Sequence, residues 1–173
     1  MLSKALEGKT ILDFTLLLPG PLATNILAQM GARIIKVEHP KKKDGTRMFP
    51  PYVNDKAILY RMLNHNKEEL LIDFRVEKGR AHILELVKKA DVFVEQFRPQ
   101  VMKAWGLDYE SLKIINPDLI YLSLSGYGQE GEYSLNAGHD LNYLACTGIL
   151  DLIRDENGKP VIPGVQIADI AGG

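Results

Sequence analysis

Cysteine is almost absent from this sequence. Cys146 is the only one, which excludes an internal disulfide and any zinc site built from several cysteines. Long apolar runs are absent too, since no stretch approaches the roughly 20 residues that a membrane-spanning helix needs. The first residues, MLSKALEGKT, lack the continuous apolar core of a secretory signal. We therefore expect a cytoplasmic protein that has no membrane partner.

Neither sign of charge dominates the chain. Its 173 residues include 21 Lys and Arg against 22 Asp and Glu, which gives a formal net charge of −1. Proteins that bind nucleic acids usually carry a basic excess, so we expect no nucleic-acid partner. With 46% hydrophobic and 25% charged residues, the composition is that of one globular domain with a sizeable core.

The last residues form a poor ending for a compact domain. The chain stops at ADIAGG, where two glycines follow an apolar run. Nothing there is typical of a capped terminal helix or of a polar tail. We expect the chain to be a fragment whose partner segment is missing, and a naturally frayed end is the alternative.

Strand patterns and helix patterns alternate along the chain. Strands are predicted at residues 9–15, 33–38, 69–74, 91–97 and 119–125. Helices are predicted at residues 21–30, 58–63, 77–90, 99–105, 109–116 and 139–154. Residues 39–55 are predicted to form a long surface loop, and residues 161–173 are left unassigned. This alternation predicts an α/β fold with an open, mostly parallel sheet.

Ligands of such a fold bind in the loops that follow the carboxyl ends of the strands. The loop after the first strand has Gly20 between two prolines and lacks the spacing G-x-G-x-x-G. We therefore reject a NAD site, although Glu38 ends the second strand as a ribose-binding acid would. The absence of G-x-x-x-x-G-K-[ST] also excludes a P-loop. A helix that begins after the first loop can still favour an anion or an enolate oxygen.

A concentrated basic loop follows the second strand of this nearly neutral chain. Residues 41–43 are consecutive lysines, and Arg47 comes shortly after them. Such side chains suit phosphate groups, which gives one interpretation of the loop. A solvated run of charges is the commoner alternative, and the residues alone leave both open.

Candidates for chemistry lie in the last third of the chain. His139 follows Gly138 at a predicted helix start, where it can act as an acid or base near neutral pH. The alternative is that Asp140 caps the helix and His139 is simply exposed. Asp169 interrupts the apolar stretch VQIADIAGG and is either a helix cap or a partly buried functional acid. Cys146 lies in an apolar helical pattern and is interpreted as a core residue.

Several long strings of this sequence resemble the class III coenzyme A transferase family, which includes the α-methylacyl-CoA racemases. In chain order they are LLLPGPLATNILAQMGARIIKVE, DVFVEQFRPQVMKAWGL, NPDLIYLSLSGYGQEGEY, GHDLNYLACTG and ADIAGG. The resemblance covers nearly the whole chain, and the order of its motifs makes it specific.

This resemblance implies a fold and an assembly. The family has a Rossmann-like large domain, with helices on both faces of its sheet, and a small domain, in an interlocked homodimer. Residues 1–173 would be the N-terminal portion of the CoA-binding large domain, without the small domain and the C-terminal return segment. Family active sites lie between the large domain of one subunit and the small domain of the other.

The resemblance also implies roles for individual residues. In the racemases, the histidine of the GHD motif and a later aspartate form the acid–base pair, and these positions are His139 and Asp169 here. In the transferases the same aspartate, Asp169, is the nucleophile that forms an acyl anhydride. The expected contacts of the adenosine-phosphate part of coenzyme A are Arg47, Leu71, Asp73, Gln96, Phe97 and Arg98.

Some positions depart from the family pattern. Gln96 stands where asparagine is usual, and Gln100 stands where glycine is usual. Ala104 occupies a position that is often arginine, so the neighbouring Lys103 is a candidate for that phosphate contact. Leu18 replaces a glutamine that is common in formyl-CoA transferases, which also commonly lack GHDLNY. Both of these last points favour the racemases.

The resemblance predicts an acyl-CoA enzyme that uses a coenzyme A thioester as substrate, with no tightly bound cofactor and no metal. The first hypothesis is racemisation of the α-carbon of a 2-methylacyl-CoA by two-base proton transfer. The second is a CoA transferase that moves CoA between carboxylic acids through an aspartyl-CoA anhydride at Asp169. The third is that this chain by itself is a non-catalytic, CoA-binding fragment.

Overall fold

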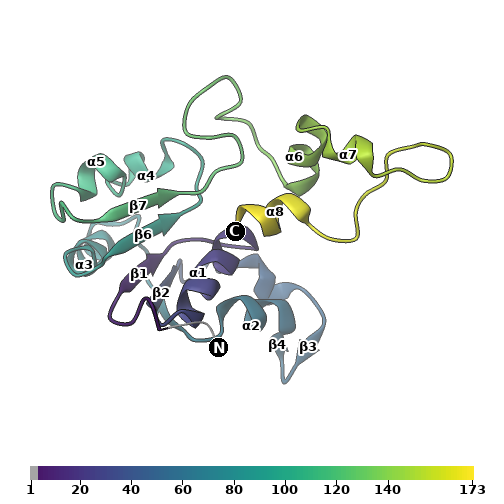
Figure 1. The fold of residues 1–173 in the computed structure, drawn as a ribbon. Coiled ribbons are helices and arrows are strands. Elements are labelled where there is room, and N and C mark those ends of the chain that lie inside the picture. Colours follow the sequence, from purple (N-terminus) through teal and green to yellow (C-terminus); the bar gives the residue numbers. More distant parts are fainter. Residues whose placement is uncertain (1–3) are drawn as a thin grey trace.

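The computed structural model describes residues 4–173 and has a five-stranded sheet at its centre (Figure 1). Its strands lie in the order β5-β2-β1-β6-β7. They are β1 (Thr10–Asp13), β2 (Arg33–Glu38), β5 (Lys67–Leu71), β6 (Val92–Glu95) and β7 (Ile120–Ser123). All neighbouring strands of this sheet pair in parallel. The predicted open, parallel α/β sheet is therefore confirmed.

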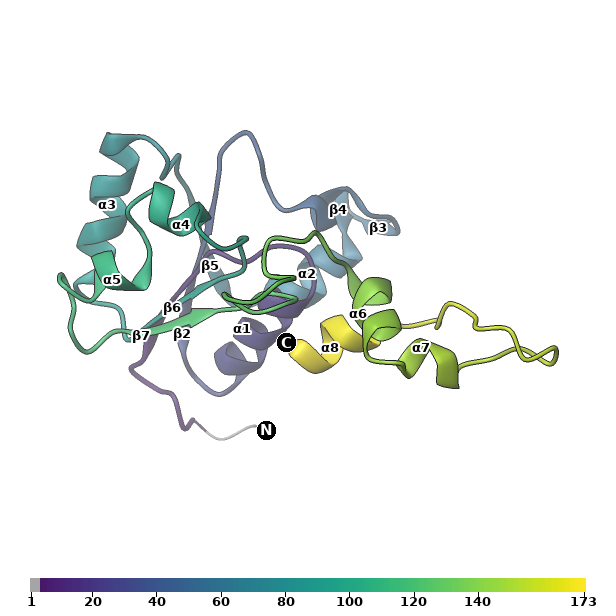
Figure 2. The same cartoon turned by 90° about the horizontal axis from the view of Figure 1, so that it is seen from above.

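Helices cover both faces of this sheet (Figure 2). One face carries α1 (Pro19–Gln29) and α2 (Ile58–Asn64). The other face carries α3 (Glu77–Val87), α4 (Val101–Ala104) and α5 (Tyr109–Leu112). Among residues 4–173, no helix combines the length and the apolar character that crossing a membrane would require.

The last part of the chain forms a projection beside α1 (Figure 1). It contains α6 (Asp140–Cys146), α7 (Ile149–Leu152) and α8 (Ile167–Gly172). Helix α6 contacts both α7 and α8, and α8 contacts α1. The C-terminal end of the described chain therefore returns to the start of the first helix.

Successive residues of a strand point to opposite faces of the sheet, so each strand serves two apolar layers. Leu12 and Phe93 belong to the layer of α3, where Ile83 is fully buried. Ile11 belongs to the layer of α1, against which the partly buried Leu27 packs. Each fully buried side chain of this size contributes about 1.5–3 kcal/mol through the hydrophobic effect.

The third strand of the chain's sheet lies earlier than the sequence pattern predicts. Strand β5 pairs with β2, whereas the apolar pattern predicts residues 69–74. The N–H of Ile72 still donates to the carbonyl of Glu38, after which the chain turns and Phe74 enters the core. The pattern ELLIDF therefore combines a strand end with a turn into the core, which apolar periodicity does not separate.

The prediction of a bare loop at residues 39–55 is wrong. This segment contains the 3₁₀ helix η1 (Gly45–Met48) and strand β3 (Tyr52–Val53). Strand β3 pairs antiparallel with β4 (Lys56–Ala57). Residues this rich in proline and charge show no apolar period, so their local structure depends on turns and on side-chain contacts.

The prediction of one helix at residues 139–154 is also wrong. Gly148 has a φ of 78°, and this left-handed conformation separates α6 from α7. Cys146 is exposed rather than part of the core. Helix α6 buries only Asp140 and Leu144, so most of its apolar pattern does not face the interior.

Candidate functional site

A cavity of about 470 Å³ lies beyond the carboxyl ends of the central strands. Leu17 and Pro19 follow β1 and form one wall, and Gln96, Phe97 and Arg98 follow β6 and form another. The chain leaves β1 toward α1 on one face and leaves β6 toward α4 on the other. A cavity between two such strands is at the switch point, where open α/β sheets bind their ligands.

The loop after β7 and the C-terminal helices complete this cavity. Ser125, Gly126 and Tyr127 line it from the loop, His139 and Tyr143 from α6 and its start, and Asp169 from α8. The loops after β2 and β5 do not contribute lining residues among those that the structure describes. The rule that ligands bind beyond the carboxyl ends of the strands therefore predicts where the cavity lies. It does not predict which of the loops line the cavity.

The structure brings His139 and Asp169 together at this cavity. His139 immediately precedes α6, and its backbone N–H donates to Asn142 Oδ1 at 2.9 Å, which fixes the helix start. Asp169 lies in the first turn of α8, and its Oδ2 accepts a hydrogen bond from Gln166 Nε2 at 3.1 Å. An imidazole and a carboxyl, two groups that can act as general acids or bases, therefore line one cavity from two helices.

Asp140 connects these two helices. It is buried, and its Oδ1 accepts the backbone N–H of Ala168 at 2.6 Å and that of Asp169 at 3.3 Å. A carboxylate there satisfies free N–H groups and suits the helix dipole. Asp140 thus caps α8, whereas its position in the sequence suggests only a cap of its own helix. No sequence signal identifies a capped helix so far along the chain.

The surroundings of Asp169 favour its protonated form. Burial raises the pKa of the Asp169 carboxyl above its usual value, and the Asp140 carboxylate acts in the same direction, while His139 opposes both. Burial and the Asp169 charge also raise the pKa of Tyr143. A carboxyl whose pKa is raised toward neutrality is better matched to proton transfer at physiological pH.

Tyr143 forms a cavity wall because two glycines leave room for its ring. A Cβ atom on Gly126 would lie 2.0 Å from Tyr143 Oη, and one on Gly138 would lie 2.6 Å from Cε1. The rings of Tyr127 and Tyr143 meet edge-on, with their centroids 5.2 Å apart. These glycines allow backbone and ring to approach more closely than any side chain would permit.

The turn after β6 joins the cavity to the core. The ring of Phe97 meets Trp105 edge-on with centroids 5.3 Å apart, and its backbone N–H donates to Glu95 Oε2 at 2.7 Å. Gln96 Oε1 is buried and has no hydrogen-bond partner among residues 4–173. Of the coenzyme A contacts that the resemblance implies, Gln96, Phe97 and Arg98 thus line the same cavity as His139 and Asp169.

Arg47, another expected contact, lies away from this cavity and is bound by the protein itself. Its guanidinium is 2.8 Å from Glu38 Oε1, 3.1 Å from Glu69 Oε2 and 3.8 Å above the Tyr60 ring. The ion pair with Glu38 helps to raise the pKa of Arg47 against the effect of burial. Its role toward phosphates stays a prediction.

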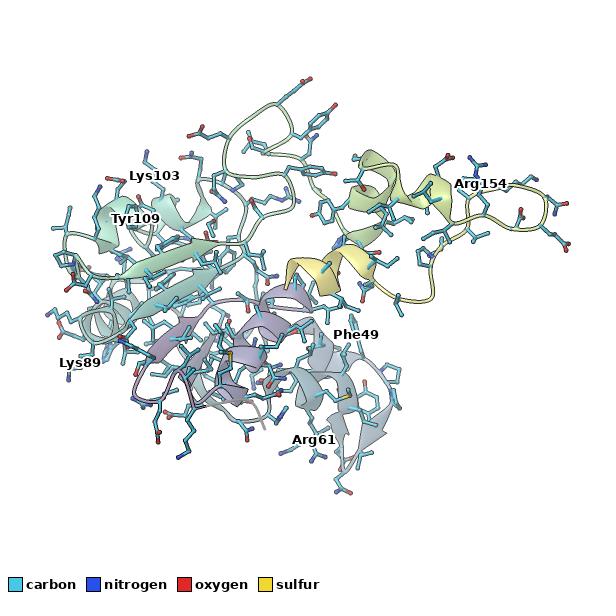
Figure 3. All side chains as sticks on the ribbon, viewed as in Figure 1. Phe49, Arg61, Lys89, Lys103, Tyr109 and Arg154 are labelled. Atoms are coloured by element: carbon cyan, nitrogen blue, oxygen red, sulfur yellow. The ribbon has the colours of Figure 1, made fainter. Side chains whose placement is uncertain are left out.

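The remaining expected contacts are dispersed. Asp73 pairs with Arg75 at 3.0 Å and with His39 at 3.1 Å, and the Arg75 guanidinium holds the pKa of Asp73 below its usual range. Leu71 is exposed at the end of β5. Lys103 belongs to a second hollow of about 410 Å³ beside α4 and α5, where Figure 3 shows it near Tyr109. These roles too stay predictions.

Comparisons with known proteins agree with this architecture. Residues 6–173 match CoA-transferase family III. The chain is 43% identical over 171 residues to succinyl-CoA:glutarate CoA-transferase from Homo sapiens, covering 98% of this chain and 39% of that protein. It is 37% identical over 170 residues to α-methylacyl-CoA racemase from Homo sapiens, covering 98% of this chain and 41% of that protein.

A solved structure supports the same conclusion. The crystal structure of Rv3272 from M. tuberculosis superposes with a TM-score of 0.90 at 34% identity, covering 100% of this chain and 49% of that one. The chain therefore spans less than half the length of these relatives. Because the family match extends over residues 6–173, and the parallel sheet is shared with a solved structure, the chain belongs to CoA-transferase family III.

Proposed function

We propose that the protein, in its natural full length, racemises the α-carbon of 2-methylacyl-CoA thioesters. The observation that carries this proposal is the meeting of His139 and Asp169 at one cavity, from two different helices. Inversion at carbon needs one group to remove a proton and another to supply one on the opposite face. An imidazole and a carboxyl whose pKa is raised are suited to both tasks.

The proposed reaction proceeds through an enolate-like intermediate. One of the two groups removes the α-proton, and the electron pair of the C–H bond moves onto the thioester oxygen. The other group then delivers a proton to the α-carbon from the opposite face, and the two exchange roles with direction. Helix α1 begins at Pro19 on the cavity wall, and its positive end favours the developing oxygen charge.

The proposed substrate is a coenzyme A thioester, and the proposed assembly is the interlocked homodimer of the family. Gln96, Phe97 and Arg98 line the cavity. The resemblance assigns them to the adenosine-phosphate part of coenzyme A, and their position beside His139 and Asp169 supports instead the proposal that they contact the thioester end of the ligand. Arg47, Leu71, Asp73 and Lys103 are proposed for the adenosine-phosphate end, which would extend away from the cavity.

A CoA transferase is the second candidate, because the human succinyl-CoA:glutarate CoA-transferase is more similar to this chain than the human racemase is. In that reaction a carboxylate oxygen of Asp169 would attack the thioester carbonyl. The carbon–sulfur bond would break, the CoA thiolate would leave, and an acyl anhydride with Asp169 would form. The CoA thiolate would then attack the Asp169 carbonyl of this anhydride, which releases the first acid as a carboxylate and leaves CoA on Asp169 as a thioester. A second carboxylate would attack that thioester and expel the thiolate, and attack of the thiolate on the carbonyl of the second acyl group would form the new thioester and free Asp169.

One experiment separates the two reactions. The natural full-length protein is incubated in D₂O with one epimer of a 2-methylacyl-CoA and an unrelated free carboxylic acid, and the products are followed by NMR and mass spectrometry. We expect deuterium at the α-carbon and loss of chirality without a new thioester. A new thioester of the added acid, without exchange at the α-carbon, would contradict the racemase and establish the transferase.

Variants of the two acid–base residues test their pairing. His139→Ala and Asp169→Asn should each lower racemisation by about 10²–10⁴, since that is what general acid–base groups contribute. His82→Ala is the matched control, because His82 lies on α3 and only contacts the Lys78 carbonyl. If the His139→Ala variant racemises the substrate at nearly the wild-type rate, the pairing of His139 with Asp169 is rejected. Loss of CoA transfer in Asp169→Asn but not in His139→Ala would instead assign Asp169 as nucleophile.

A further inference from the structure

The wall of the cavity that follows β1 has an unusual backbone conformation. Leu17 lines the cavity at a φ of 62°, in the left-handed region. A branched side chain rarely adopts this region, and such residues persist there only where their surroundings hold them. The contacts that hold Leu17 therefore also determine the shape of this wall.

Asp44 is the residue that contacts the Leu17 backbone. The N–H of Leu17 lies 3.2 Å from both Oδ1 and Oδ2 of Asp44. Asp44 is 1% exposed and belongs to the loop after β2. Its Oδ1 also accepts hydrogen bonds from the Thr46 N–H at 2.9 Å and from Thr46 Oγ1 at 2.7 Å. The hydrogen bonds from Thr46 therefore fix the orientation of the Asp44 carboxylate independently of its contact with Leu17.

Lys36 of β2 holds the same segment from its other end. Its Nζ lies 3.2 Å from Asp44 Oδ2 and donates to the carbonyl of Thr15 at 2.8 Å. Both charged side chains are completely buried. Buried charges need partners of opposite sign and saturated hydrogen bonds, which this arrangement supplies. Lys36 donates a hydrogen bond to the Thr15 carbonyl, and Asp44 accepts one from the Leu17 N–H. The two side chains together therefore hold the backbone in place from Thr15 to Leu17.

The same contacts connect the cavity wall to the basic loop. The backbone N–H of Asp44 donates to Glu38 Oε2 at 2.9 Å, and Glu38 in turn pairs with Arg47. Asp44 itself does not line the cavity, whereas Leu17 does. An effect of Asp44 on a ligand would therefore act through the position of Leu17.

We propose that Asp44, supported by Lys36, is a positioning residue that holds Leu17 in its left-handed conformation and so sets the cavity wall against which the acyl-CoA lies. This inference rests on the proposed function, since it takes the acyl-CoA as the ligand of the cavity. The alternative role for Asp44 is to neutralise the buried Lys36 charge. The two roles differ in one respect, because only the first depends on which residue occupies position 17.

The test is a double-mutant cycle in the natural full-length protein, with kcat and KM measured separately. Asp44→Ala should lower kcat by about 100-fold, the order of effect that a misplaced cavity wall produces, and should change KM less. In a Leu17→Gly background the same change should cost less than about 5-fold, because glycine adopts positive φ without support. Asp44→Asn keeps an acceptor for the Leu17 N–H and should lose less than Asp44→Ala.

Asp13 offers the matched control. It is an equally buried carboxylate that pairs with Lys67 at 3.2 Å, and its hydrogen bonds come from Thr15 and Thr24 rather than from Leu17. Leu17→Gly should therefore not rescue Asp13→Ala. Equal losses from Asp44→Ala in both backgrounds, or an unchanged kcat in Asp44→Ala, would overturn the proposal. If Asp44→Ala does not fold, Lys36→Met/Asp44→Ala leaves no unpaired buried charge and takes its place in the cycle.

A crystal structure of the Asp44→Ala variant gives a readout that needs no activity. Leu17 should leave the left-handed region and move the cavity wall, and a Leu17 that keeps its positive φ would overturn the proposal. This readout also distinguishes the two proposals. A wild-type protein without racemase or transferase activity would contradict the proposed function, while the φ of Leu17 would still decide the role of Asp44.

Discussion

Glu95 is a buried carboxyl that serves the cavity without lining it. It is 3% exposed, its Oε2 accepts the Phe97 N–H at 2.7 Å, and its Oε1 accepts a hydrogen bond from Ser123. Burial raises the pKa of Glu95 above its usual value, although these hydrogen bonds act in the opposite direction. Glu95 therefore connects the turn after β6 to strand β7 through hydrogen bonds to a carboxyl group that is buried in the interior.

Replacement of this carboxyl should stabilise the protein at neutral pH. Since the pKa of Glu95 is higher in the folded than in the unfolded state, the folded protein binds the proton more tightly. Its favourable contribution is therefore present at low pH and is lost as pH rises through the folded-state pKa. Glu95→Gln keeps an acceptor for the Phe97 N–H, and we expect about 1 kcal/mol of added stability at pH 7.

Denaturant unfolding at several pH values measures this gain. It should shrink as the pH is lowered, because the Glu95 carboxyl of the folded wild-type protein then becomes protonated and no longer buries a charge. Glu85→Gln is the control, because Glu85 forms a surface pair with Lys88 and its replacement should change stability little. A loss of stability at pH 7 in Glu95→Gln would show that its charge is needed.

At the scale of single residues, the sequence indicates the proposed reactive groups better than it indicates the residues that hold them in place. His139 and Asp169 are recognisable from their motifs, and both line the cavity. Asp44 and Asp140 act on backbone N–H groups that lie 27 and 28 residues away along the chain. Acidic residues in loops are common, so nothing local marks the few whose partner is remote.

The cavity is an assembly of elements, and Tyr143 is where α6 meets the glycine-rich loop after β7. The ring fills the space beside Gly126 and Gly138, and it faces Tyr127 edge-on. Helix α6 has few buried residues of its own, so these contacts of Tyr143 provide much of the packing that holds the helix against the rest of the protein. His139, the proposed acid–base residue, is at the start of this same helix.

Gly126→Ala should displace the Tyr143 ring. The new Cβ would lie 2.0 Å from Tyr143 Oη, and the open cavity gives the ring somewhere to move. We expect kcat/KM of the full-length protein to fall by about 10- to 100-fold, as small misplacements in a site can cause. Unfolding should change much less, because the core layers are untouched.

Gly164→Ala is the control for this change. No atom lies within 4 Å of the position that its Cβ would take, and Gly164 is not at positive φ, so activity should be unchanged. An active Gly126→Ala variant would mean that the ring position does not matter to the reaction. Circular dichroism and unfolding curves of both variants separate a local effect on the cavity from a general loss of structure.

Helices and strands are predicted well where their apolar residues repeat with one period over several helical turns or over several residues of a strand. Strand β2 has the bounds that the pattern predicts, and helix α3 and strands β1, β6 and β7 lie within their predicted ranges but are shorter. The patterns fail at residues 39–55 and at Gly148, where turn conformation rather than burial decides the structure. Helix α8 is too short to show a period, and α1 and α6 fix its place.

The molecule as a whole has an uneven surface. Several large apolar side chains of residues 139–173, the part of the chain that contains α6, α7 and α8, are exposed, with Leu152 82% exposed and Ile162 77% exposed. Ile149, Val165 and Ile170 are also exposed there. Large exposed apolar patches are typical of surfaces that bind another protein surface. The cavity lies next to this projection, because His139 and Asp169 are part of the projection and also line the cavity.

We predict that the 173-residue chain by itself self-associates and turns over acyl-CoA negligibly. Association would cover these apolar side chains, and in the proposed assembly the site would be completed by a small domain from a second subunit, which this chain does not include. Light scattering over a range of concentrations, and racemisation assays beside the natural full-length protein, test the two parts. A clean monomer at high concentration would contradict the first part, and substantial turnover the second.

The sequence by itself determined the fold class, the order of most elements and the family of this protein. Apolar periods report which residues must leave water, and this requirement is local enough to be read from the chain. The sequence also indicated the candidate reactive side chains, since the motifs around His139 and Asp169 are continuous strings.

Only the tertiary structure decided how these side chains are held. The left-handed Leu17, the cap that Asp140 places on α8 and the seat of Tyr143 each depend on two segments that are distant in sequence. Buried charges and backbone N–H groups must find partners wherever the fold brings them within about 3 Å, the usual length of a hydrogen bond. That choice depends on the arrangement in space, and no local pattern in the chain records it.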